Sequence, residues 1–119
     1  DYVLIEVFQF FSQLIEALNQ LGAVDIIIDP GFGFGKTIEH NYTLLHHLDY
    51  FKSLIKPILA GISRKSMINK ILDTKAADAL NGTSVLNTIA LMQGASILRV
   101  HDVREAVECV KLVEYTKKN

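Results

Sequence analysis

Three short runs of apolar residues stand out against the more polar remainder of the chain. They cover residues 24–28, 57–62 and 95–100, and they are rich in Ile, Val and Leu. They lack the alternation of polar and apolar positions that a half-exposed strand shows, and such runs are typical of strands covered on both faces. The pattern therefore predicts three buried parallel strands.

Amphipathic patterns with a helical period lie before, between and after these runs. In the last of them Val103, Ala106, Val107, Val110 and Val113 form one apolar stripe. The expected helices cover about residues 3–21, 39–53, 65–72, 83–93 and 103–115. Successive strands start more than thirty residues apart, which leaves room for a crossover helix. This order predicts an α/β fold, either a small open sheet or a slice of a larger one.

Composition limits the number of domains and the kinds of partner. The chain has 119 residues, 50% of them apolar, which suits one core, and no linker-like stretch divides it. A formal net charge of -1 argues against nucleic acid or an acidic membrane surface as a partner. The single cysteine, Cys109, excludes an internal disulfide and fits a reducing cytoplasm. Because the chain opens with Asp1, directly before a helix, we also expect an upstream part to be missing.

Each predicted strand ends in polar or charged residues. Asp29 follows the first run, residues 63–65 follow the second, and residues 99–102 include the end of the third. The carboxyl ends of parallel strands meet at one edge of a sheet, where α/β proteins place their ligand sites. We therefore expect these three clusters to form one site.

The first cluster, DPGFGFGKT at 29–37, is a glycine-rich loop. A nucleotide-binding P-loop is excluded because Pro30 stands where that motif needs glycine, and the dinucleotide fingerprint also fails. Asp29 could accept two parallel hydrogen bonds from an amidine-like ring edge. The alternative is a turn-forming Asp before Pro and Gly.

The second and third clusters are basic. Ser63 could cap the following helix and leave Arg64 and Lys65 facing a carboxylate or phosphate, or the two cations could simply be solvated. Arg99 and His101 would share one face of a strand, and a buried Arg implies an anionic ligand or a facing carboxylate. His101 could donate to an anion or be a structural histidine. Asp102, with Glu105, resembles the capping box of the last helix.

Other reactive side chains have structural interpretations. His40, His46 and His47 lie on or beside a helix whose apolar positions are elsewhere, so we expect them at the surface. Cys109 lacks a basic neighbour that would make it a nucleophile.

Taken together, the motifs DPGFGFGKT at 29–37, SRKS at 63–66 and RVHD at 99–102 resemble those of the dihydropteroate synthase family, and the match extends over 81–102. The resemblance implies a TIM (β/α)8 barrel with these motifs on strands six, seven and eight. Residues 1–119 would then be the C-terminal portion of one barrel domain whose N-terminal half is absent.

The resemblance also implies the chemistry. The amine of p-aminobenzoate would attack the methylene carbon of 6-hydroxymethyl-7,8-dihydropterin pyrophosphate, giving 7,8-dihydropteroate and pyrophosphate, in an enzyme that sulfonamides target. Mg2+ would assist the leaving group from a ligand in the missing half, with no metal ligand in this part. Lys65, Arg99 and His101 would be catalytic. Asp29 would bind the edge of the pterin ring, and Lys65 would hydrogen-bond the pterin. Phe34 would form a wall of the p-aminobenzoate pocket, and Ser63 would help to hold its carboxylate. Arg99 would stack on the pterin and, with His101, contact the pyrophosphate, and Arg64 would join the substrate-binding set.

Further expectations follow from this resemblance. A barrel needs about 250 residues, so we expect this chain alone to be inactive and, with two unpaired apolar sheet edges, prone to associate. The full-length protein is expected to be a cytoplasmic homodimer to which the last helices contribute. Two alternatives stay open: a methyltetrahydrofolate-type pterin-binding methyltransferase, and a non-catalytic pterin-binding fragment.

Overall fold

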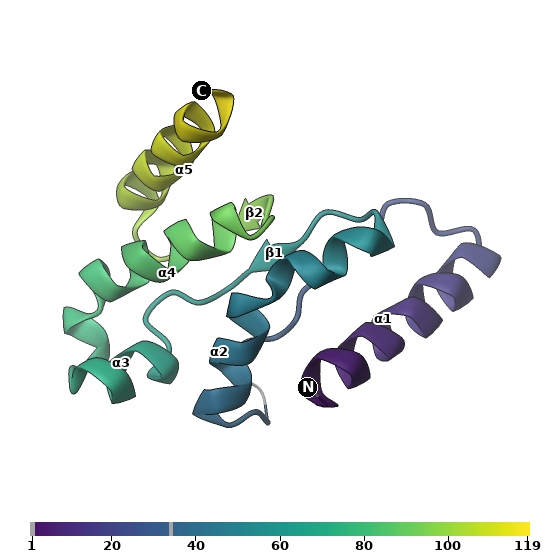
Figure 1. Ribbon diagram of the computed structural model, residues 1–119, viewed down its shortest axis with the longest axis horizontal. Coiled ribbons are helices and arrows are strands. Elements are labelled where there is room, and N and C mark those ends of the chain that lie inside the picture. The colour runs from purple at the N-terminus through teal and green to yellow at the C-terminus, as the bar shows by residue number, and fades with distance from the viewer. Residues whose placement is uncertain (1, 34) are drawn as a thin grey trace.

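The computed structural model describes residues 2–33 and 35–119, so Asp1 and Phe34 lie outside the described residues. Helices outnumber strands, and the two short strands lie near the middle of the molecule, between α1 at one end and α5 at the other (Figure 1). In chain order the elements are α1 Tyr2–Gln20, α2 Ile38–His46, the 3-10 helix η1 Leu48–Leu54, β1 Leu59–Ala60, α3 Ser66–Leu72, the 3-10 helix η2 Ala76–Asp78, α4 Leu80–Met92, β2 Ile97–Leu98 and α5 Val103–Lys118.

The predicted parallel pairing is confirmed. β1 and β2 pair in parallel, with Leu59 opposite Ile97 and Ala60 opposite Leu98. On the other side of β1, Ile28 forms a parallel bridge with Ile58. The three apolar runs therefore lie side by side with the second run in the middle, and the described chain is an α/β unit.

The predicted strand at 24–28 is wrong in its extent. Only Ile28 joins the ladder: its N–H donates to Pro57 O at 2.9 Å, and its carbonyl accepts from Leu59 N at 2.8 Å. Val24 is 76% exposed and Ile27 55%, because this segment has a neighbour on one side alone and touches it at one residue. The other two strands are likewise shorter than the apolar runs that predicted them.

The five predicted helices are present with shifted ends. The segment 39–53 divides into α2 and η1, because His47 leaves the helical backbone region with φ -115° and ψ 27°. Helix α4 begins at Leu80, three residues before the predicted start, and α5 continues to Lys118.

The core packs against one face of β1. Ile58, Ala60 and Ile62 lie two residues apart on that face and are buried, whereas Leu59 on the opposite face is only partly buried, so the predicted covering of both faces is incomplete. Helix α1 docks through aromatic side chains: Phe8 and Phe11 contact the ring of Phe51, which is completely buried. The remaining fully buried large side chains come mainly from α2, η1 and α3, namely Leu44, Leu45, Leu48, Met67 and Ile68. This packing fixes the carboxyl end of β1, where the polar clusters follow.

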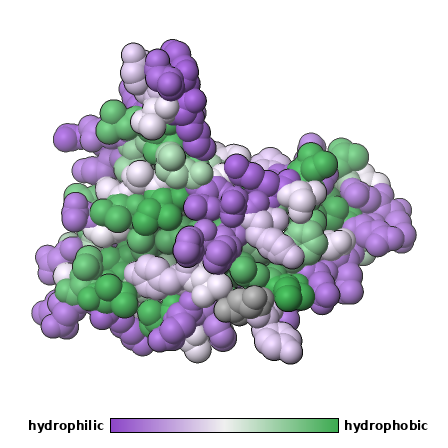
Figure 2. Space-filling view, in the orientation of Figure 1, coloured by the Kyte–Doolittle hydropathy of each residue, from purple (hydrophilic) through white to green (hydrophobic). Residues whose placement is uncertain are grey.

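Apolar side chains also reach the surface. Figure 2 shows them gathered over α3 and α4, where Ile71, Leu72, Val85 and Ile89 are exposed. Within residues 2–33 and 35–119, no helix combines the length and the apolar character needed to cross a membrane.

Candidate functional site

A small hollow lies just past the carboxyl ends of β1 and β2. Its volume is about 150 Å³, and it is lined by Gly61, Ser63, Lys65, Arg99, Val100 and His101. The prediction that the second and third polar clusters gather at one sheet edge is confirmed. The strand β2 ends at Leu98, so Arg99 and His101 face this hollow from the segment after the strand and not from the strand itself.

Asp29 connects the first cluster to the third. Its Oδ2 accepts a hydrogen bond from Nη1 of Arg99 at 3.1 Å, and its Oδ1 accepts from the N–H of Gly31 at 2.9 Å. One carboxylate oxygen thus stabilises the turn, as the structural interpretation proposed, while the other reaches the basic cluster. The expectation that Arg99 is buried is wrong, because its side chain is 53% exposed, but the expected carboxylate partner is present.

The glycine-rich loop lies against Lys65. Gly31, Gly33 and Gly35 all have positive φ values of 70°, 91° and 63°, which explains why glycine occupies these alternating positions. The Lys65 ammonium donates to the carbonyl of Phe32 at 2.6 Å. Phe34, which we expected to wall a ligand pocket, lies outside the described residues.

Asn41 on helix α2 hydrogen-bonds to this loop, and the sequence pattern did not identify it as a site residue. It is buried on α2, where its Oδ1 accepts from the N–H of Gly33 at 2.8 Å and its Nδ2 donates to Thr37 O at 3.0 Å. A signal was available, since Asn41 occupies the same helical stripe as Leu44, Leu45 and Leu48. A polar residue on an apolar stripe needs a partner, and here the partner is the loop.

Ser63 does not cap a helix, contrary to expectation. The N-cap of α3 is Lys65, which makes no side-chain capping bond, so Arg64 and Lys65 precede the helix. Ser63 Oγ instead lies 2.8 Å from Nδ1 of His101 and accepts the His101 backbone N–H at 3.3 Å. The hydroxyl of Ser63 can also donate to Nδ1 or accept a proton from it, since a hydroxyl oxygen has two lone pairs and the roles depend on the tautomer of His101.

Asp102 occupies the N-cap position of α5 but makes no side-chain capping bond, so the predicted capping box is wrong. Its carboxylate pairs with Arg64, at 2.8 Å from Nη2 to Oδ1 and 3.3 Å from Nε to Oδ2. A carboxylate cap and an ion pair are both charge-assisted, but the pair with Arg64 uses both carboxylate oxygens and two N–H groups of a cation, which explains the exchange of partners.

Burial lowers the pKa of Lys65 below its ordinary value of 10.5, and the nearby Arg99 lowers it further, while Asp29 acts in the opposite direction. An anion in the hollow would favour the ammonium form. We predict that the affinity of this chain for inorganic pyrophosphate is highest below the lowered pKa and falls as the pH rises through it. Isothermal titration across an alkaline pH series measures this. Lys65→Gln should flatten the profile, whereas Lys70→Gln on the exposed side of α3 should not.

Gly61 has no side chain, and the guanidinium of Arg99 lies in the space where a Cβ would be. A Cβ at Gly61 would overlap Nη2 of Arg99 and lie 2.9 Å from its Cζ, so the guanidinium would have to move. We predict that Gly61→Ala weakens pyrophosphate binding about tenfold, since small displacements of a binding group are costly. In an Arg99→Ala background the same substitution should have no further effect. Equal losses in both backgrounds would contradict this account.

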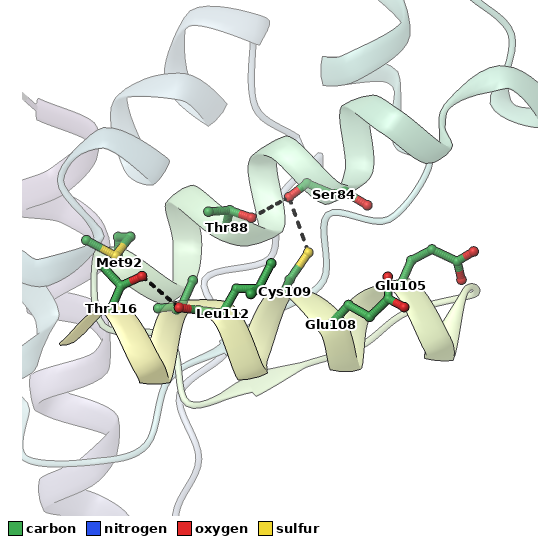
Figure 3. A pocket seen from close by; sticks show the side chains of 9 residues that line it. Ser84, Thr88, Met92, Glu105, Glu108, Cys109, Leu112 and Thr116 are labelled. Atoms are coloured by element: carbon green, nitrogen blue, oxygen red, sulfur yellow. Dashed lines mark hydrogen bonds between the residues drawn. The ribbon is translucent and has the colours of Figure 1, made fainter. Parts of the chain in front are cut away.

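A larger groove lies away from this site, between α4 and α5 (Figure 3). Its volume is about 400 Å³, and Cys109 lies in it with its thiol 3.7 Å from the carbonyl of Ser84. The predicted site residues do not line it, so size alone does not identify the functional site. Its lining residues are Ser84, Thr88, Met92, Glu105, Glu108, Cys109, Leu112, Val113 and Thr116.

The residues that could hold a metal ion are dispersed. In the described part of the chain, no three His, Cys, Asp or Glu side chains come together as a group that could hold one. His46 and His47 are exposed with their rings stacked at 4.4 Å, in agreement with the expected surface position.

Comparison with known proteins gives consistent results. The sequence profile of a family described as pterin binding enzyme matches residues 1–101. The dihydropteroate synthase of Escherichia coli strain K12 is 45% identical over 118 residues, which cover 98% of this chain and 42% of that relative. The bifunctional dihydropteroate synthase/dihydropteroate reductase of Helicobacter pylori is 44% identical over 107 residues, covering 90% of this chain and 28% of that relative.

Solved structures agree. The dihydropteroate synthase of Yersinia pestis superposes with a TM-score of 0.94 at 40% identity, over 98% of this chain and 49% of that one. The enzyme of Coxiella burnetii, in complex with pteroic acid, gives 0.95 at 36% identity, over 99% and 46%. The chain thus spans less than half the length of these relatives. The predicted resemblance to dihydropteroate synthases is confirmed, and the chain belongs to the family of pterin-binding enzymes.

Proposed function

We propose that this chain supplies strands six to eight of a dihydropteroate synthase barrel, with residues 1–119 forming one portion of a single (β/α)8 domain. Three observations support this assignment: the parallel order of the three apolar runs, the polar clusters at their carboxyl ends, and the similarity to solved synthases. In TIM barrels the active site lies at that end of the strands, and phosphate sites often follow strands seven and eight.

The observation that supports this function best is the convergence of Lys65, Arg99 and His101 on one hollow. An ammonium, a guanidinium and an imidazole N–H form a set of donors suited to a pyrophosphate group. Asp29, joined to this set through Arg99, offers a carboxylate for the amidine-like edge of a pterin ring. The pterin ring of dihydropterin pyrophosphate would thus meet the carboxylate, and its pyrophosphate would meet the adjoining basic groups.

These residues can promote the reaction without a protein nucleophile. The amine nitrogen of p-aminobenzoate forms a bond to the methylene carbon while the carbon–oxygen bond to pyrophosphate breaks, and negative charge develops on the departing group. The ammonium formed at the nitrogen then loses one proton to solvent. Lys65, Arg99 and His101 stabilise that charge, and the site positions the amine near the carbon. Arg99 pairs with Asp29 at an exposed position, and such pairs contribute only about 0 to 1 kcal/mol, so substrate can replace the pair at low cost.

The p-aminobenzoate site is assigned to Phe34 and Ser63. The Ser63 hydroxyl lies 2.8 Å from Nδ1 of His101, so a carboxylate bound to Ser63 would lie beside the imidazole. One solved relative, the synthase of Yersinia pestis, is described as a sulfonamide drug complex, which supports an aniline-type site in the family.

Two parts of the proposal lie beyond these residues. Mg2+ is implied by the family, but the described residues do not fit a metal centre, so the steps above use protein groups alone. A homodimer is also proposed for the full-length protein. Exposed apolar residues of α5, including Val107, Leu112 and Tyr115, are the features that support a contact there.

A chimera tests the proposal. This chain would replace the matching segment of the Escherichia coli synthase, and formation of dihydropteroate with release of pyrophosphate would be measured. Turnover supports the proposal. A folded chimera that binds pterin, shows no turnover, and binds neither p-aminobenzoate nor a sulfonamide would instead favour the methyltransferase or the non-catalytic alternative. The isolated chain is expected to be inactive, and wild-type-like turnover by a soluble monomer of it would refute that expectation.

A further inference from the structure

The turn between β1 and α3 has an unusual backbone. Arg64 adopts a left-handed conformation with φ 57°, which side chains with a Cβ rarely adopt. Three groups hold it there: Thr83, a buried residue of α4, accepts the Arg64 N–H at 3.1 Å; Asn69 donates to the Arg64 carbonyl at 3.3 Å; and Asp102 binds the guanidinium. A strained residue persists only when its surroundings fix it.

The two residues on either side of Arg64 point into the hollow. Ser63 and Lys65 line it, as does His101 next to Asp102. Arg64 and Asp102 are absent from that lining within the described residues. Their half-buried ion pair therefore joins the two active-site segments from outside the hollow, and directly beside it Ser63 Oγ meets His101 Nδ1.

We infer that Arg64 and Asp102 are positioning residues: their ion pair fixes the left-handed turn at 64 and thereby sets the positions of Ser63, Lys65 and His101 for pyrophosphate. Arg64 then acts through the turn and not as a ligand to substrate, which revises its expected place in the substrate-binding set. The inference rests on the proposed function in one respect, the identity of the anion.

The charge of Asp102 provides a discriminating test. Removing a carboxylate near an anion site strengthens anion binding if charge alone matters. If the ion pair positions the site, Asp102→Asn weakens binding despite the loss of negative charge. Arg64→Gln weakens it as well, and the double variant is no weaker than either single one, because both substitutions break one interaction.

The experiment uses the chimeric synthase and inorganic pyrophosphate, because the isolated chain is expected to associate. Isothermal titration gives the affinity, and nitrogen NMR of the His101 imidazole reports whether the Ser63 contact persists. Asp102→Asn and Arg64→Gln are each expected to weaken binding about tenfold, as displaced binding groups do, and to move the His101 signals toward those of an exposed imidazole. Glu108→Gln is the matched control, since it breaks an exposed pair with Arg104 on the same helix. Asp102→Glu should restore part of the affinity.

Several results would overturn the inference. Tighter or unchanged pyrophosphate binding in Asp102→Asn, with unchanged His101 signals, would show that Asp102 positions nothing. Additive losses in the double variant would make Arg64 an independent ligand. If the unmodified chimera binds no pyrophosphate, the proposed function fails, while the His101 signals still decide whether the ion pair sets the site. If Asp102→Asn does not fold, Asp102→Glu and Arg64→Lys decide the same question, since both keep the charges and alter the geometry.

Discussion

Replacing Arg99 by alanine should lower kcat/KM of the chimeric synthase about a thousandfold, the upper range for loss of one donor to developing negative charge. Arg99 is the guanidinium that faces the hollow and also the partner of Asp29, so its loss removes the proposed pyrophosphate contact and leaves that carboxylate without its cation. Steady-state kinetics with dihydropterin pyrophosphate and p-aminobenzoate measure the effect.

Two further variants define the cause. Arg99→Lys keeps the charge but loses the planar fork of donors, so it should recover only part of the rate. Arg104→Ala removes an exposed arginine of α5 and should leave the rate unchanged. A loss of less than tenfold in Arg99→Ala would show that this guanidinium does not contact the departing group.

Replacing Phe51 by alanine should lower the free energy of unfolding of this chain by about 3 to 5 kcal/mol. The side chain is 0% exposed, and its ring contacts those of Phe8, Phe11 and Tyr50, so truncation leaves a cavity between α1 and η1. Urea unfolding followed by circular dichroism measures the change.

The control is the same substitution at an exposed phenylalanine. Phe10 is 60% exposed on α1, and Phe10→Ala should cost less than about 1 kcal/mol. Similar losses for both variants would indicate that α1 is not docked on η1 through Phe51.

The location of the site could be predicted because it depends on a general property of parallel sheets. Asp29, Lys65, Arg99 and His101 lie at or just after the end of an apolar run. They share one edge of the sheet if the runs are parallel neighbours. The glycine spacing in 29–37 similarly anticipated backbone conformations that the structure contains.

The partners of these residues could not be predicted in the same way. Ser63 and Asp102 are both good helix caps by local sequence, and each instead binds a side chain 38 residues away. The predicted length of the strand at 24–28 was wrong for a related reason. An apolar run forms a strand only where a neighbouring segment supplies hydrogen bonds. The local sequence pattern is compatible with several hydrogen-bond partners for a residue, and the tertiary contacts determine which partner it has.

The parallel ladder also constrains how the chain folds. The pairing of Ile28 with Ile58 closes a loop of about thirty residues, and that of Leu59 with Ile97 closes one of about forty. Contacts between distant residues slow folding, because chain entropy is lost before any contact repays it. Helices α4 and α5 lie side by side in parallel and close shorter loops, since Cys109 meets Ser84 and Lys117 meets Leu91 at separations of 25 and 26 residues. We therefore expect the parallel pair of helices α4 and α5 to gain protection from amide hydrogen exchange before β1 does, so that the functional edge of the sheet is assembled last.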